Sequence, residues 1–487
     1  MAHGRRRPAA LLVSAAIAVT LLSWIPPASG VTPPTVRLFA AAPKITVPRY
    51  GRGPVQLDLG VWVASVGGPF QLDVSRPDYL TPVGIEQVDA ETGDVLRILP
   101  ASVLDGWYGL KDFLDITLRD AEGHRVLSHS FTFCPNNYDP DRVDDAGPAI
   151  SRYPVICSAN PFTMGMVWGI EDRWAVDPAN AYPGIAVKVP DGRYTATVQV
   201  APLYVRMLGI SAQDASATID VTIEKYVYPF PGVHRRGTGP MTPSDPVPTV
   251  TDPDPATLPD LGALPAWGMD VSREGGRDNL TFAATVSNAG RQPLVVEGFR
   301  RVGTGVMDAY QYFYSDGQPV GRAPVGTFEY DPRPGHEHWH FQQFATYALL
   351  DADKNEIAPS EKEAFCLAPT DAIDLTAPGA NWSPFSVGLS TACGAATSIW
   401  VRETLDAGWG DTYFQSLPGQ SFDISDLPNG RYYIRVAVNP SGLLSETSIE
   451  NNVSYRRLRL KGQSGHRTVV VPPYFGIDTE SDCPFCY

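Results

Sequence analysis

Lysine is scarce in this chain of 487 residues, which has seven lysines and 31 arginines. Basic residues of both kinds number 38 against 53 acidic ones, and the formal net charge is −15. A protein that binds nucleic acid usually neutralises phosphates with a basic surface, so this charge excludes nucleic acid as the main partner. The acidic balance fits cationic small molecules, basic protein surfaces or simply high solubility.

Long apolar runs are absent beyond the first thirty residues. Three arginines at 5–7 precede an apolar stretch at 9–24 and small residues at 28–30, which is the pattern of a secretory signal peptide over 1–30. The stretch is short for a membrane span, and no later run reaches the roughly 20 apolar residues that a spanning helix needs. We therefore expect a secreted, extracellular protein without stable membrane insertion, whose mature chain begins near Val31.

Cysteine is also rare: the chain has six, enough for three disulfides in a secreted protein. Pairing sequence neighbours is the simplest of the possible connectivities. The last two, Cys483 and Cys486, enclose a Pro-Phe pair as in a redox motif, but no thioredoxin-like pattern surrounds them. We expect them to form a small disulfide loop in a C-terminal tail over 476–487.

The region 229–267 is dense in Pro, Asp, Thr and Gly. Such a composition buries little apolar surface, so it predicts an extended, semi-rigid linker. This linker divides the mature chain into two domains, which we place at 31–228 and 268–475.

Both domains carry the signals of short strands. Apolar and polar residues alternate over 194–200 and 431–438, where β-branched and aromatic residues are enriched. Turn signals, Pro-Asp-Gly at 190–192 and Pro-Asn-Gly at 428–430, precede them. With abundant Gly and Pro, these patterns predict an all-β fold of two tandem β-sandwiches.

The two domains also resemble each other in sequence. The segment 189–194, Val-Pro-Asp-Gly-Arg-Tyr, matches Leu-Pro-Asn-Gly-Arg-Tyr at 427–432, and each domain has a Phe-Cys pair with a second cysteine downstream. We interpret this as an internal duplication, which favours the disulfides Cys134–Cys157 and Cys366–Cys393.

Three of the eight histidines, His336, His338 and His340, lie two residues apart in the second domain. In a strand they would share one face, so that three ring nitrogens could meet at one metal ion. Three imidazoles with an open position suit copper, zinc or non-haem iron, and the Irving–Williams order favours copper. The alternative is a chance cluster on a surface strand.

The segment 336–351 resembles the copper-binding segment of the lysyl oxidases. Lys-Glu-Ala-Phe-Cys-Leu at 362–367 is similar to their Lys-Ala-Ser-Phe-Cys-Leu, and Trp-Gly-Asp-Thr-Tyr at 409–413 is similar to their Trp-Asp-Met-Tyr segment. The resemblance extends over about 280–474 and rests on several motifs in a consistent order.

The resemblance implies a ligand set and a cofactor. His336, His338 and His340 would bind copper, while Lys362 and Tyr413 would be the precursors of lysine tyrosylquinone. The chain would then be a copper-dependent oxidase that converts primary amines, either peptidyl lysine or free amines, to aldehydes with O2, releasing H2O2 and ammonia. This chemistry needs a general base.

Two carboxylates, Asp411 and Glu403, lie near Tyr413 in sequence, and the sequence does not decide which of them is the base. The first domain lacks the whole set: Ser130 stands in place of the lysine, and Trp174-Ala175 lies near the tyrosine position. Chemistry is therefore expected in the second domain.

Other functions fit parts of the pattern. A non-catalytic, metal-binding tandem β-sandwich of a surface or matrix is the main alternative, since the first domain shows that the scaffold tolerates loss of the cluster. A cupin-type dioxygenase would need a carboxylate ligand and a further distant histidine, for which His466 is the one candidate. The natural amine, the role of the first domain and the oligomeric state stay open.

Overall fold

The structure is a computed structural model that describes residues 32–49, 53–57, 59–136, 140–143, 146–158, 160–178, 186–225, 243–301, 305–331, 338–342, 344–359, 364–384, 389–394, 398–417 and 419–480. The expected signal peptide, His336, Lys362 and the Cys483/Cys486 pair lie outside these residues. Residues 33–487 form one compact unit. Below, "first half" means 33–225 and "second half" means 243–480.

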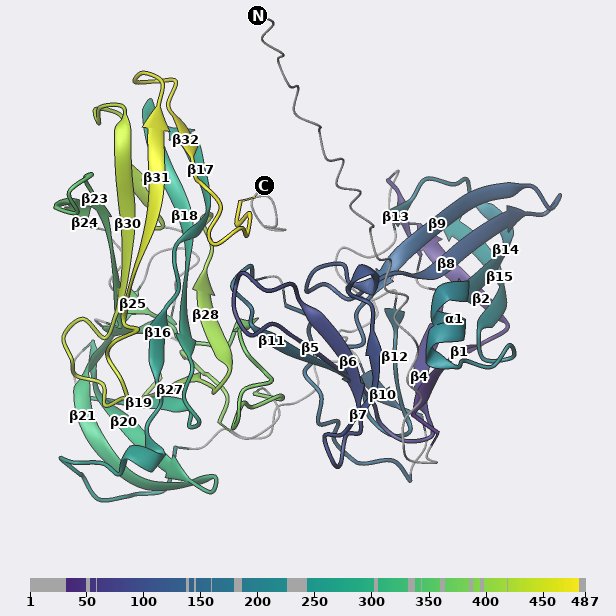
Figure 1. The fold of residues 1–487 in the computed structure, drawn as a ribbon, viewed down its shortest axis with the longest axis horizontal. Helices are drawn as coiled ribbons and strands as arrows, with labels where there is room; N and C mark the ends of the chain where they lie inside the picture. Colours follow the sequence, from purple (N-terminus) through teal and green to yellow (C-terminus); the bar gives the residue numbers. More distant parts are fainter. Residues whose placement is uncertain are drawn as a thin grey trace, which may run out of the picture. The chain divides into compact units, whose positions relative to one another are not determined.

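The described chain is built of strands, as the alternating patterns predict (Figure 1). The α-helix α1 (Pro202–Leu208) and the 3₁₀ turns η1 (Ala101–Val103) and η3 (Pro255–Thr257) are the helical elements among the described residues. The all-β expectation is thus confirmed. Over these same residues, no helix has both the length and the apolar character needed to cross a bilayer.

The first half forms four sheets with the orders β1-β4-β12-β10, β11-β5-β6-β7, β13-β3 and β2-β15-β14-β8-β9. Its strands are β1 (Thr35–Ala40), β2 (Lys44–Arg49), β3 (Val55–Gln56), β4 (Val61–Val66), β5 (Phe70–Ser75), β6 (Gly84–Val88), β7 (Val95–Leu99), β8 (Leu110–Asp120), β9 (Arg125–Phe133), β10 (Pro140–Arg142), β11 (Gly165–Ile170), β12 (Trp174–Val176), β13 (Ala186–Val187), β14 (Gly192–Val200) and β15 (Ser216–Lys225).

The second half forms three sheets with the orders β16-β18-β28-β26, β25-β22-β21-β20-β19-β27 and β24-β23-β30-β31-β32, and β17 and β29 also pair with β18. Its strands are β16 (Leu261–Ala263), β17 (Trp267–Glu274), β18 (Arg277–Asn288), β19 (Leu294–Arg300), β20 (Val306–Ser315), β21 (Gln318–Asp331), β22 (His338–Gln342), β23 (Ala345–Leu350), β24 (Glu356–Pro359), β25 (Ala364–Phe365), β26 (Asp371–Ala372), β27 (Trp400–Leu405), β28 (Trp409–Tyr413), β29 (Ser421–Asp423), β30 (Gly430–Val438), β31 (Val453–Lys461) and β32 (Thr468–Val470).

Two sheets recur in the same chain order in both halves. The order β11-β5-β6-β7 corresponds to β27-β19-β20-β21, and β15-β14-β8-β9 corresponds to β31-β30-β23-β24. The edge strands differ, because β2 runs parallel to β15 whereas β32 runs antiparallel to β31. The shared order supports the predicted duplication.

The turn before each central strand is closed in the same way. The hydroxyl of Tyr194 donates to the carbonyl of Pro190 at 2.8 Å, and that of Tyr432 donates to Pro428 at 2.7 Å. Tyr194 lies opposite Asp120 across the ladder of β14 and β8. The Pro-x-Gly-Arg-Tyr motif therefore forms the same turn in both halves.

Two disulfides are present among the described cysteines: Cys134–Cys157 and Cys366–Cys393. These are the two pairs that the duplication favours. Each ties the end of a strand, β9 or β25, to a loop 23 or 27 residues further along the chain.

The described part of the expected linker, 243–267, is packed onto the second half. Ser244 donates its hydroxyl to Glu297 at 2.6 Å, and Val250 N–H donates to the Arg322 carbonyl at 2.8 Å. Strand β16 then pairs with β18, and Trp267 is fully buried. Hydrogen bonds to the sheets at Ser244 and Val250, and the burial of Trp267, hold this Pro-rich stretch in place.

Because Tyr194 and Tyr432 make the same hydrogen bond, we expect their loss to lower the free energy of unfolding by similar amounts. Replacing Tyr432 or Tyr194 by Phe removes one hydroxyl-to-carbonyl hydrogen bond, and each change should lower the free energy of unfolding by about 1 kcal/mol. Tyr455→Phe, at a ring that is 41% exposed, is the control and should change stability by less than about 0.5 kcal/mol. Thermal and denaturant unfolding measure all three. A cost at one tyrosine alone would mean that the two turns are not equivalent.

Candidate metal and tyrosine site

Strand β22 carries His338 and His340 on one face. It pairs antiparallel with β21, so that His338 lies opposite Asp331 and His340 opposite Glu329. Alternation along the strand sends Trp339 and Phe341 to the other face, where both are buried. The prediction that alternate histidines share a strand face is confirmed for His338 and His340.

The two imidazoles converge. Their Nε2 atoms are 2.9 Å apart, and the ring planes meet at 76°. Two nitrogens that each bind one metal ion at about 2.0–2.1 Å, with an angle of roughly 90–110° between the bonds, lie about 2.9–3.4 Å from each other. The pair therefore has the spacing of two adjacent ligands of one ion, and imidazole suits copper, zinc and iron.

The other nitrogen of His340 faces a carboxylate. Its Nδ1 lies 3.7 Å from Asp331 Oδ2, and both side chains are largely buried. A carboxylate behind a ligating histidine commonly fixes the tautomer and directs the opposite nitrogen toward the metal. Asp331 is thus suited to direct Nε2 of His340 toward the ion.

The buried face of β22 fixes the orientation of the histidines. The Trp339 ring meets Tyr330 edge-on, at 5.8 Å between centroids, and Arg300 lies over its face at 5.2 Å. A rotation of the strand that moved His338 or His340 would have to displace this fully buried indole. Close packing of the core therefore limits the movement of the ligands.

Tyr413 ends strand β28, where it lies opposite Ala284 of β18. Its hydroxyl accepts a hydrogen bond from Cys366 N–H at 2.9 Å and donates to the carbonyl of Cys366 at 3.1 Å. Burial raises the pKa of Tyr413 well above the usual tyrosine value, and the carboxylates of Asp411 and Glu403 raise it further. At neutral pH the ring is therefore a phenol rather than a phenolate.

One short segment connects the histidine strand to Tyr413. Phe365 of β25 lies opposite Phe341 of β22, and its ring meets the Tyr413 ring edge-on at 4.9 Å. The next residue, Cys366, holds the tyrosine hydroxyl and is bonded to Cys393, whose carbonyl accepts from Trp339 N–H at 2.9 Å. The disulfide and the strand pairing thus fix Tyr413 beside the strand that carries the histidines.

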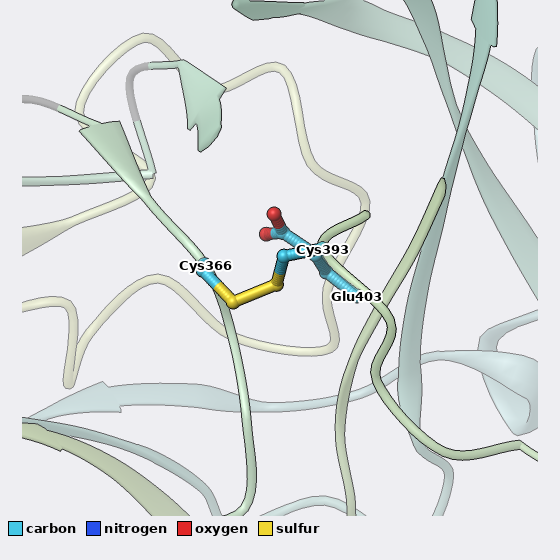
Figure 2. Close-up of side chains that lie close together, drawn as sticks. All are labelled: Cys366, Cys393 and Glu403. Carbon is cyan, nitrogen blue, oxygen red and sulfur yellow. A yellow bond between two sulfur atoms is a disulfide. The ribbon is translucent and has the colours of Figure 1, made fainter. Parts of the chain in front are cut away.

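Glu403 of β27 lies against this disulfide (Figure 2). It is fully buried, and its Oε2 accepts from Leu367 N–H at 3.0 Å, while Oε1 has no hydrogen-bond partner among the described residues. Burial raises its pKa well above the usual glutamate value, and the charge of Asp411 adds to this. Because the two sulfurs are bonded to each other, Cys366, Cys393 and Glu403 do not form a thiolate metal site.

The neighbour of Glu403 is held by a buried ion pair. Arg402 Nη2 lies 2.7 Å from Glu297 Oε1, and both side chains are almost fully buried. Trp400 and Ser244 also donate to the Glu297 carboxylate, at 3.1 and 2.6 Å. This satisfied network holds β27 in place, and the strand's alternation directs Glu403 to the opposite face, toward Leu367.

The structure thus brings His338 and His340 together on β22, and it places the carboxylates of Asp411 and Glu403 near Tyr413. His336 and Lys362 lie outside the described residues. Sequence reasoning did not single out Asp331. The position of this carboxylate just before the histidine cluster could have indicated it. Its approach to His340, however, depends on the register between β21 and β22.

Comparison with known proteins agrees with this geometry. Residues 322–470 match the family model described as lysyl oxidase. The chain is similar to protein-lysine 6-oxidase of Rattus norvegicus, with 31% identity over 142 residues, which cover 28% of this chain and 31% of the rat protein. The same enzyme of Sus scrofa is also 31% identical over 142 residues, and 51% of its length is covered.

More distant relatives match a similar region. Lysyl oxidase homolog 2 of Gallus gallus is 27% identical over 173 residues, which cover 35% of this chain and 20% of that protein. The chain thus spans between about a fifth and a half of the length of these relatives. The solved structure of the Bacillus anthracis TIE protein aligns with 90% of this chain and with 57% of its own chain, at 6% sequence identity. The TM-score of 0.09 is too low to indicate a common fold.

The convergent imidazoles predict metal binding that depends on them. His340→Ala removes one of the two convergent imidazoles. If it binds the ion, the affinity for Cu²⁺ or Zn²⁺ should fall by more than the roughly 10- to 100-fold that loss of an outer partner costs. His129→Ala, at an exposed position of β9, is the control and should leave the affinity unchanged. Titration calorimetry and the metal content after dialysis measure both. Equal affinity in the two variants would exclude His340 as a ligand.

Proposed function

We propose that this chain is a secreted, copper-dependent oxidase of primary amines, because residues 322–470 match the lysyl oxidase family model. The reaction would take a primary amine, O2 and water to an aldehyde, ammonia and H2O2. One observation carries the proposal: the strand with the two convergent histidines and a partly buried tyrosine are both bound to the same short segment, 364–367.

His336, His338 and His340 would hold the copper ion, and the 2.9 Å spacing of the described pair supports this assignment. Copper and the lysine tyrosylquinone made from Lys362 and Tyr413 would supply, when present, the electron-accepting chemistry that side chains lack. The protein itself would bind the amine, orient it, and move protons.

Tyr413 is suited to be the aromatic precursor. Its hydroxyl is fixed by the Cys366 peptide, and its ring is held against Phe365. Lys362 is only four residues before Cys366, and four extended residues span at most about 14 Å. The two precursors are therefore tethered to the same short segment, which favours their joining over competing reactions.

Glu403 is the better candidate for the general base, a choice that the sequence alone leaves open. Glu403 Oε2 and the Tyr413 hydroxyl bind consecutive backbone N–H groups, those of Leu367 and Cys366. A pKa raised by burial toward the working pH is what a general base needs.

The substrate would be a cationic primary amine, either peptidyl lysine or a free amine. The name of the relatives, protein-lysine 6-oxidase, supports the first, and the net charge of −15 suits attraction of either. An extracellular location follows from the expected signal peptide over 1–30. The alternative, a non-catalytic metal-binding β-sandwich, predicts copper binding without a quinone.

Removing either precursor should abolish turnover. Tyr413→Phe and Lys362→Ala should show no quinone absorbance and no amine-dependent H2O2 release, because each lacks one half of the cofactor, whereas copper content should be kept. Lys354→Ala, at a turn lysine over Tyr433 and Tyr455, is the control and should turn over normally. Peptide mass mapping of the copper-loaded protein should find the Lys362 and Tyr413 peptides covalently joined; two free peptides in a copper-replete protein would favour the non-catalytic alternative.

The two carboxylates should differ in their effects. Glu403→Gln should lower kcat for amine oxidation by about 10²- to 10⁴-fold, the usual contribution of a general base, with quinone absorbance retained. Because the pKa of Glu403 is raised, activity should be lost as the pH falls through a value above the usual glutamate range. Asp411→Asn should have the smaller effect on kcat. The opposite ranking, with quinone intact in both variants, would make Asp411 the base.

A further inference from the structure

We propose that the first half has a function of its own: it positions the strand that carries Tyr413, by inserting the segment 160–165 into the second half, with Asn160 as the positioning residue. This inference rests on the proposed function only in taking Tyr413 as the reactive tyrosine. It assigns a role to the half whose sequence has no counterpart of the histidine cluster 336–340.

Asn160 belongs to the first half, but its side chain is bound in the second. It is fully buried, and its amide nitrogen donates to Thr285 Oγ1 at 3.1 Å and to Thr412 Oγ1 at 3.4 Å. The two threonine hydroxyls are 2.8 Å apart, and Trp267 Nε1 donates to Thr285 at 3.2 Å. Asn160 thus completes a buried polar cluster around the residue that precedes Tyr413.

The position of Thr412 explains why this contact matters. Thr412 and Tyr413 point to opposite faces of β28. A group that binds Thr412 therefore contacts the face of the strand opposite the Tyr413 side chain. The strand is short, pairing with β18 over four residues and with β26 over two. With so few ladder bonds, side-chain contacts contribute much of what fixes its position.

An aromatic side chain of the same segment fills the adjacent space. Phe162 is fully buried and packs in one cluster with Trp267 and Ala283, against which Phe414 also packs. Its ring meets Tyr474 edge-on at 5.5 Å. The residues on both sides of Tyr413, Thr412 and Phe414, therefore pack against structure that the first half contributes.

The backbone of the insertion is paired with the strand next to β28. The hydroxyls of Ser158 and Thr163 donate to the Ala372 carbonyl at 3.0 and 2.8 Å, and Gly165 bridges Asp374. Ala372 lies in β26, opposite Trp409 of β28. A side chain at Gly165 would collide with Thr376 and Asp374, so the close approach requires glycine.

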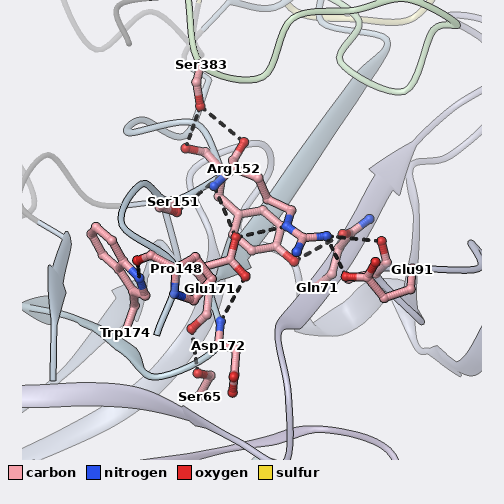
Figure 3. A network of polar contacts seen from close by, with 12 residues as sticks. Ser65, Gln71, Glu91, Pro148, Ser151, Arg152, Glu171, Asp172, Trp174 and Ser383 are labelled. Atoms are coloured by element: carbon pink, nitrogen blue, oxygen red, sulfur yellow. Dashed lines mark hydrogen bonds and ion pairs between the residues drawn. The ribbon is translucent and has the colours of Figure 1, made fainter. Parts of the chain in front are cut away.

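A second contact anchors the halves to each other (Figure 3). Ser383 donates its hydroxyl to the carbonyls of Arg152 and Tyr153 at 3.1 and 3.2 Å, and Trp382 stacks on the Tyr153 ring. Arg152 is itself paired with Glu171 at 2.9 Å. The insertion at Asn160 is therefore one part of a larger contact and does not rest on a single hydrogen bond.

The test is a set of variants in the full-length chain. In Asn160→Ala, the rate of quinone formation after copper addition should fall about five- to tenfold, as expected when a buried hydrogen bond that orients a reacting group is lost. Copper affinity should stay unchanged. Asn136→Ala is the matched control, because Asn136 is an equally buried asparagine of the first half whose hydrogen bonds stay within that half.

A double-mutant cycle and hydrogen exchange make the test specific. If Asn160 acts through Thr412, the variant Asn160→Ala/Thr412→Val should be no slower than Thr412→Val alone. Amide exchange of the peptide that contains β28 should rise in Asn160→Ala and not in Asn136→Ala. Gly165→Val, which prevents the close approach without touching β28, should give the same exchange pattern.

The outcomes separate this inference from the proposed function. If the wild-type protein forms no quinone, the cofactor assignment fails, but the exchange measurement still decides the positioning role. Unchanged exchange of β28 in Asn160→Ala and Gly165→Val would overturn the positioning role. A quinone that forms at the wild-type rate in Asn160→Ala would also overturn it.

Discussion

The site depends on one peptide group, that of Cys366. Its N–H and C=O both bind the hydroxyl of Tyr413, so the phenol is fixed in position and in hydrogen-bond direction. The same residue carries the disulfide to Cys393, and Cys393 is bound in turn to the backbone of the histidine strand. A displacement of this peptide would therefore disturb both the tyrosine and the strand that carries His338 and His340.

Two buried carboxylates of the second half, Glu297 and Glu403, differ in the groups that bind them. Glu297 is bound by Arg402, Trp400 and Ser244, so its charge is compensated and it serves to hold β27. Glu403 is equally buried, but among the described residues its carboxylate is faced by backbone N–H groups rather than by a cation. Such a group is costly to bury while ionised, and burial raises the pKa of Glu403 well above the usual glutamate value.

The sequence predicts those parts of the site that depend on local periodicity. The all-β class, the same-face placement of His338 and His340 and the duplicated cysteine pairs follow from alternation and spacing, and the structure agrees. The pairing of Glu403 with Leu367 and the insertion of Asn160 could not be predicted, because both join segments more than 30 residues apart through loops without periodicity. Lys362 and His336 stay predictions, since they lie outside the described residues.

The two halves share contacts that stabilise the fold, and their sequences differ at the histidine strand. The contacts that repeat, such as Tyr194 with Pro190 and Tyr432 with Pro428, lie in turns and ladders, whereas His338 and His340 lie on the face of β22 opposite Trp339 and Phe341. Loss of the insertion at 160–165 would expose Phe162 and leave Thr412 short of a partner. Packing against the second half is therefore a constraint on the first half that is independent of catalysis.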